Sequence, residues 1–153
     1  MSPAPAADIS QAEEREALIC VDDPELLKQV VNSIDGLRFS SPFSVDDAVA
    51  RLRAHYYEVI LISDTFRCDS RYDNLVLVAV GNIPIEQRRT QFVVLLSRDL
   101  PTADALAAFA SGVDVVVNVS ELDRTGRLIW AGRTEKKVFY RRYLDALENL
   151  AVS

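Results

Sequence analysis

Residues 58–66, EVILISDTF, place four consecutive apolar residues between one acid and the polar pair Ser63-Asp64. A short apolar run with these boundaries predicts a fully buried β-strand. In open α/β sheets, ligands and reacting groups gather just beyond the carboxyl ends of such strands. This stretch therefore poses a choice: either Asp64 is a reacting carboxylate, or Ser63 stands where a reacting carboxylate would be.

Strand and helix patterns alternate along the chain around this run. Further strands are predicted at 17–21, 37–43, 91–97 and 114–119, and helices at 25–34, 45–55, 103–112 and 124–150. Residues 74–83, NLVLVAVGNI, suit a strand by composition, but their place between two buried strands favours a crossover helix, which we predict. The alternation predicts an α/β fold, a flavodoxin-like doubly wound sheet of five parallel strands in the order 2-1-3-4-5, with an extended C-terminal helix.

Three residues are predicted to cap helices. Asp23, directly before a proline, suits the N-cap of the first helix. Ser44, followed three residues later by an aspartate, suits the N-cap of the second helix. Thr102 is the predicted cap of the helix at 103–112.

The chain has 153 residues, a formal net charge of −6, 49% hydrophobic residues and 26% charged residues. This composition indicates one globular domain, assigned to residues 17–150, with residues 1–16 as a disordered tail or linker. The acidic balance argues against nucleic-acid and membrane partners. Two isolated cysteines without a secretory signal indicate free thiols and a cytoplasmic location. With His55 as the single histidine, we expect no multi-histidine zinc site and no enzymatic activity.

Four stretches carry a resemblance to a known family: LICVDDPELL (18–27), the opening stretch, QFVVLLSRD (91–99) and SGVDVVVNVSEL (111–122). Together they resemble the receiver domains of bacterial two-component response regulators, over about residues 17–135. The resemblance implies that Asp22 and Asp23 are the acidic pair that holds Mg²⁺. It also implies that Ser97 is the hydroxyl that contacts the phosphoryl group.

Two departures from the family pattern concern the reaction itself. The register of the third strand puts Ser63 in the phosphoacceptor position, with Asp64 one residue late, and Val119 stands where receivers have a lysine. Arg67 and Arg98 are the basic residues that could reach inward instead. Phosphoryl transfer to aspartate needs a nucleophile, a metal and a fixed cation. We therefore expect a degenerate receiver, or pseudo-receiver, that signals without phosphorylation and without a cofactor.

Other interpretations of the same residues remain open. An active phosphoacceptor would use Asp64 as nucleophile, with Mg²⁺ held by Asp22, Asp23 and Asp64. A second alternative is a domain that binds a small ligand in the same crevice. In the plainest interpretation, Asp23 is only an N-cap, Asp64 is a solvated loop residue and Ser97 simply ends its strand.

The C-terminal helix pattern is longer than the sheet requires, about 40 Å at 1.5 Å per residue. Gly126 and Gly132 predict a weaker first half. The second half has apolar residues at helical spacing, flanked by the pairs Lys136-Lys137 and Arg141-Arg142; they are Phe139, Tyr140, Tyr143, Leu144 and Leu147. The helix either packs on its own domain or pairs with a protein partner or a second copy. We expect the contact face to comprise the fourth helix, the fifth strand and this fifth helix, as receivers often use.

Overall fold

A computed structural model describes residues 15–152 of the chain. Its elements, in order, are β1 (Glu16–Cys20), α2 (Pro24–Ser33), β2 (Arg38–Ser40), α3 (Val45–Ala54), β3 (Val59–Ser63), η1 (Arg71–Asp73), α4 (Leu75–Gly81), α5 (Ile85–Arg88), β4 (Phe92–Ser97), α6 (Ala105–Ser111), β5 (Val115–Asn118), η2 (Val119–Arg124) and α7 (Thr125–Val152). Most of the segment expected to be a tail lies outside the described residues, although Glu16 already belongs to β1. Within residues 15–152, no helix has the length and apolar character needed to cross a membrane.

The five strands form one parallel sheet in the order β2-β1-β3-β4-β5, which confirms the predicted topology. The opening stretch supplies the central strand, and all five residues of β3 are buried. Its neighbours are β1 and β4, and the strand ends Cys20, Ser63 and Ser97 lie at the same edge of the sheet. This edge is where the candidate site was expected.

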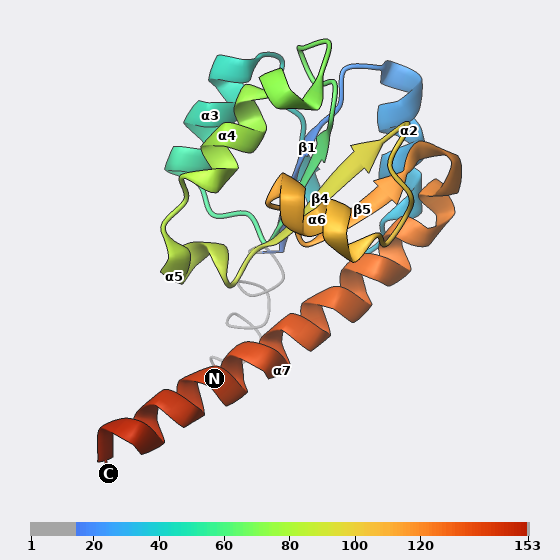
Figure 1. The fold of residues 1–153 in the computed structure, drawn as a ribbon. Coiled ribbons are helices and arrows are strands. Elements are labelled where there is room, and N and C mark those ends of the chain that lie inside the picture. The colour runs from blue at the N-terminus through green and yellow to red at the C-terminus, as the bar shows by residue number, and fades with distance from the viewer. Residues whose placement is uncertain (1–14, 153) are drawn as a thin grey trace, which may run out of the picture.

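Helices cover both faces of the sheet (Figure 1). On one face, α3, α4 and α6 enclose a cluster that includes Cys20, Ile60 and Leu95. On the other face, α2 and α7 enclose a second cluster, with Val30 from α2 and Ile129 from α7. Alternate residues of the central strands pack into one cluster or the other. The sequences of these strands are therefore continuously apolar.

The ambiguous segment 74–83 contains a helix, as we predicted. Asn74 is the N-cap of α4, and its side-chain oxygen accepts hydrogen bonds from the backbone N–H groups of Val76 and Leu77, each at 3.1 Å. Asparagine before an apolar run is a helix-start signal, and it decides between helix and strand here. The short helices η1 and α5 were not predicted.

Two predicted caps are confirmed and one is wrong. The Asp23 carboxylate accepts a hydrogen bond from the N–H of Glu25, and the Ser44 hydroxyl accepts one from the N–H of Asp47. The cap of α6 is Asp104 and not Thr102. The Thr102 hydroxyl accepts a hydrogen bond from the N–H of Asn118 at 2.9 Å, so it joins the loop before α6 to the end of β5.

Helix α7 extends past the sheet (Figure 1). Its two glycines lie where the helix approaches the domain most closely. A Cβ at Gly132 would lie 2.4 Å from a ring carbon of Phe92, and a Cβ at Gly126 would lie 2.7 Å from the carbonyl oxygen of Ser33. Both glycines therefore allow α7 to pack on the domain. Gly126 and Gly132 both lie within the continuous helix α7.

Candidate functional site at the carboxyl edge of the sheet

The first acid of the predicted pair is bonded to an arginine. The Asp22 carboxylate pairs with the guanidinium of Arg67, with Oδ1 and Nε 2.8 Å apart, and it accepts a hydrogen bond from the backbone N–H of Arg67 at 2.6 Å. A second guanidinium nitrogen of Arg67 donates to the carbonyl oxygen of Phe43 at 2.8 Å. Arg67 has a positive φ of 54°, which is unusual for a residue with a side chain. The backbone of the loop after β3 is thus shaped around the Asp22 carboxylate.

The second acid, Asp23, is an exposed N-cap of α2. One of its carboxylate oxygens accepts the N–H of Glu25 at 3.0 Å. The predicted N-cap role of Asp23 is therefore confirmed. Asp22 and Asp23 do not form a matched pair, because they are bonded to different partners.

Ser63 ends β3, and Asp64 follows it in the loop. Both side chains are buried, with 7% exposure for Ser63 and 5% for Asp64. The alternative of a solvated Asp64 is therefore wrong: its N–H donates to the carbonyl oxygen of Leu96, and this bond holds the residue beside β4. The Ser63 hydroxyl lies 3.5 Å from the hydroxyl of Thr65.

Sequence reasoning missed Asn74 as a residue of this site. Besides capping α4, its side-chain NH₂ donates to the carbonyl oxygens of Ser63 at 3.0 Å and Asp64 at 3.1 Å. The side chain is 1% exposed. Asn74 thus holds the end of β3 in a fixed position relative to the start of α4. The sequence could indicate Asn74 only as a helix cap, because its other two partners, Ser63 and Asp64, are distant in the sequence.

The hydroxyl of Ser97 is used within its own turn. Ser97 is fully buried; its hydroxyl donates to the Asp99 carboxylate at 2.7 Å and accepts the N–H groups of Asp99 and Leu100. Arg71 pairs with the same carboxylate at 3.1 Å. The Ser97 hydroxyl, and after it Arg71, hold the pKa of Asp99 below its usual value. The group predicted to contact a phosphoryl oxygen is therefore part of a closed turn.

Val119, at the position of the family's lysine, packs against the apolar cluster on the α2 and α7 face. The residue before it, Asn118, donates from its side chain to the carbonyl oxygen of Leu100 at 2.9 Å and caps η2. Arg98 is exposed, and its carbonyl oxygen accepts a longer bond from Asn118. Of the two arginines considered, Arg67 reaches the acidic pair, while the side chain of Arg98 forms no hydrogen bond or ion pair with the described residues.

Neither cysteine thiol is activated. Cys20 ends β1 beneath the site, and burial, followed by the charge of Asp22, raises its pKa to about 12. Burial is also the main cause that raises the pKa of Cys68. Both thiols are free. Among the described residues, no three histidine, cysteine, aspartate or glutamate side chains gather in a way that could hold a metal.

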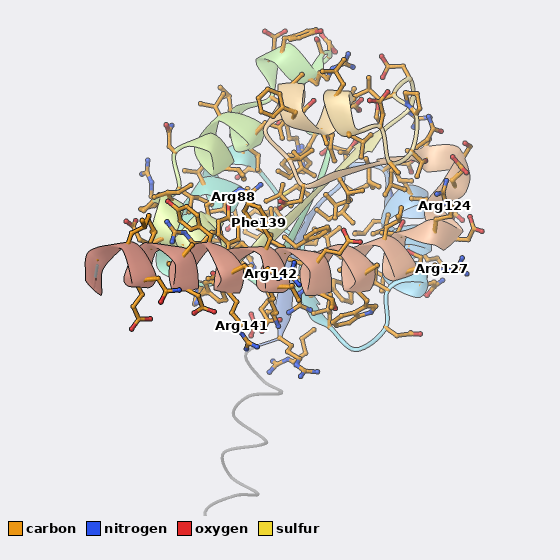
Figure 2. All side chains as sticks on the ribbon, turned by 60° about the horizontal axis from the view of Figure 1, so that its bottom comes forward. Arg88, Arg124, Arg127, Phe139, Arg141 and Arg142 are labelled. Carbon is orange, nitrogen blue, oxygen red and sulfur yellow. The ribbon has the colours of Figure 1, made fainter. Side chains whose placement is uncertain are left out.

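The expected contact face corresponds to α6, β5 and α7. Large apolar side chains are exposed on α6, with Leu106 at 77% and Phe109 at 85%, and on α7, with Phe139 at 62%. Figure 2 shows Phe139, Arg141 and Arg142 along α7. Beyond Tyr140, every α7 side chain described is exposed. The packed-helix alternative therefore holds for the first half of α7 only.

Comparison with solved structures shows the class of fold. HP1043, an orphan response regulator of H. pylori, aligns with a TM-score of 0.58 and 16% identity over 79% of this chain and 98% of that chain. The receiver domain of the Francisella response regulator 1452 aligns with a TM-score of 0.56 and 16% identity, over 84% and 98%. The signal receiver domain of a response regulator from Colwellia psychrerythraea 34H aligns with a TM-score of 0.52 and 15% identity, over 82% and 98%.

The fold of the described residues is therefore that of response-regulator receiver domains, in agreement with the sequence resemblance. The identities are too low to carry more than the fold. Neither protein-family models nor curated proteins gave a match.

Proposed function

We propose that this chain is a signalling module of receiver fold that acts through protein contacts and not through phosphorylation, a pseudo-receiver. The observation that carries the proposal is the bonding of Asp22 to Arg67. Mg²⁺ in phosphoryl-transfer sites is held by one or two carboxylates together with water. In this chain the Arg67 guanidinium lies on one oxygen atom of that carboxylate, and the backbone N–H of Arg67 donates to the other. A metal would have to displace an internal cation before it could bind.

Two other features support the same proposal. The Ser97 hydroxyl is occupied by Asp99 and by two backbone N–H groups. Val119 offers no charge to a phosphoryl group and packs into an apolar cluster. Removal of one preorganised contact to a developing charge typically costs about 3 kcal/mol of transition-state stabilisation. With several such contacts missing, this site would stabilise the transition state of phosphoryl transfer only weakly.

One observation favours the alternative of an active phosphoacceptor. The Asp64 carboxylate forms no hydrogen bond or ion pair with the described residues, although the residue is 5% exposed. A carboxylate with no internal partner at the carboxyl edge of an open α/β sheet lies where this type of fold binds its ligands. Under this alternative, Asp64 is the nucleophile and Asp22 must release Arg67 to bind Mg²⁺.

Incubation of the purified chain with acetyl phosphate and Mg²⁺, followed by intact-mass spectrometry, tests the proposal. We expect no increase equal to one phosphoryl group. An adduct that disappears in Asp64→Asn and persists in Asp69→Asn would overturn the proposal and establish the alternative. Asp69 is a suitable control because it is an exposed aspartate of the same loop.

A further inference from the structure

Four charged side chains form a single row along the outer half of α7. Lys137, Arg141, Asp145 and Glu148 are spaced by four, four and three residues, so they project from the same side of the helix. The first two are basic and the last two are acidic. All four are exposed, and none forms an ion pair with another described residue. The basic half of the row would therefore face the acidic half of an identical row on a second helix that runs antiparallel to the first.

An apolar stripe borders this row. It continues the side of α7 that buries Ile129, because Tyr140, Tyr143 and Leu147 follow at helical spacings of three and four residues. Tyr143 and Leu147 are each 45% exposed. The described α7 side chains beyond Tyr140 are all exposed, and an isolated helix of this length is marginal in water without tertiary packing. The stripe therefore has the character of a surface that a partner covers.

A groove of about 340 Å³ lies where the stripe leaves the domain. Its lining includes the apolar side chains of Phe92, Tyr140 and Leu144, together with cations that include Arg89, Lys137 and Arg141. The buried Nε of Arg89 has no hydrogen-bond acceptor within the described part of the chain. The groove is therefore basic and apolar, whereas the last turns of α7 are acidic and apolar.

We propose that two copies of this chain form an antiparallel, two-fold symmetric dimer in which the end of each α7 occupies the basic groove of the other copy. This inference names the partner for the interaction in the proposed function and rests on it. The occupant is a second copy because the same helix carries both the basic groove wall and the acidic end that complements it. A two-fold interface uses one self-complementary patch twice.

Geometry favours the antiparallel arrangement. With the two-fold axis near Tyr143, Arg141 of one copy lies opposite Asp145 of the other copy, and the apolar Phe139 lies opposite Leu147. A parallel, in-register pair instead places identical residues at the same level, so Lys137 and Arg141 would lie beside their own copies. Like charges at close range oppose association.

Charge reversal tests the dimer by sedimentation equilibrium of the full chain. In Lys137→Glu/Arg141→Glu the whole row becomes acidic, and we expect the dimer dissociation constant to rise at least tenfold. Asp145→Lys/Glu148→Lys makes the row basic and has the same expected effect. The combined fourfold variant restores opposite charges in the antiparallel arrangement, and we expect its dissociation constant to return to within about threefold of the original. Circular dichroism verifies that α7 stays helical in every variant.

Arg142→Glu is the matched control, because Arg142 neighbours Arg141 in sequence but is not part of the groove. We expect it to leave the dissociation constant unchanged within about threefold. A chain that stays monomeric at millimolar concentration would overturn the proposed dimer, as would a dimer that the fourfold variant fails to restore. Neither result bears on phosphorylation, which the acetyl phosphate experiment tests separately.

Discussion

The guanidinium of Arg67 lies against the carboxylate of Asp22, with Nε and Oδ1 2.8 Å apart, at the carboxyl edge of the sheet. The backbone N–H of Arg67 reaches the other oxygen of the same carboxylate. This contact joins the end of β1 to the loop after β3. The acid that the sequence resemblance assigned to Mg²⁺ is thus paired within the protein.

Replacing Arg67 releases Asp22. We expect Mg²⁺ to cause larger chemical-shift changes at Asp22 in Arg67→Gly than in the wild-type chain, because the competing cation is gone. A Mg²⁺ titration followed by two-dimensional NMR measures these changes. Arg98→Ala removes an exposed arginine from the neighbouring loop and is the control. Equal responses to Mg²⁺ in the two variants would mean that Arg67 does not restrict access to Asp22.

The positive φ of Arg67 gives a separate prediction about stability. A half-exposed ion pair contributes about 0–1 kcal/mol, and both Arg67→Gly and Arg67→Ala lose it. Glycine adopts a positive φ without the steric cost of a Cβ, a cost of about 1–2 kcal/mol. We therefore expect Arg67→Gly to have a larger free energy of unfolding in urea than Arg67→Ala. The reverse order would contradict the left-handed conformation at this position.

Asn74→Ala removes four hydrogen bonds from a buried side chain. We expect the free energy of unfolding to fall by about 2–4 kcal/mol, because a cap is lost and buried backbone groups lose their partners. Asn82→Ala, at the exposed end of the same helix, is the control, and we expect a change below about 0.5 kcal/mol. A loss in Asn74→Ala no larger than in the control would show that the loop after β3 is held by other contacts.

Ser97→Ala is expected to raise the pKa of Asp99 toward its ordinary value, because the Ser97 hydroxyl is the main cause that lowers it. A carboxyl whose pKa is lower in the folded state stabilises the fold above its unfolded pKa, and this contribution is lost as the pH falls through the folded pKa. The wild-type chain should therefore lose this stabilisation at a lower pH than Ser97→Ala. Carboxyl ¹³C NMR across an acid titration measures both pKa values, and an unchanged Asp99 pKa would contradict the closed turn.

Gly132→Ala tests how closely α7 packs on the domain. The new Cβ would meet the buried ring of Phe92 at 2.4 Å, so we expect a loss of about 1–3 kcal/mol in the free energy of unfolding. Gly81→Ala is the matched control, because no atom lies within 4 Å of its Cβ position and alanine favours helix. The control should be neutral or stabilising. If both variants are equally stable, α7 does not pack where the structure places it.

The sheet and its order could be predicted because burial on both faces leaves continuous apolar runs, such as Val59–Ser63, separated by helical spacing. The cap of α6 could not be chosen reliably, since Thr102 and Asp104 both have suitable side chains and only the path of the loop decides. Arg67 was one of two arginines considered, and its contact with Asp22 joins residues far apart in the chain. Burial of Asp64 depends on a backbone bond to Leu96 in the neighbouring strand, which no local pattern reveals.

The central claim is that this chain functions without phosphorylation at the carboxyl edge of its sheet. Beryllium fluoride with Mg²⁺ mimics a phosphoryl group on an aspartate, and its binding is measured by two-dimensional NMR of the full chain. The account predicts no saturable shifts in the residues around Asp64, Asp22 and Ser97. Saturable shifts centred on Asp64, and lost in Asp64→Asn, would contradict it.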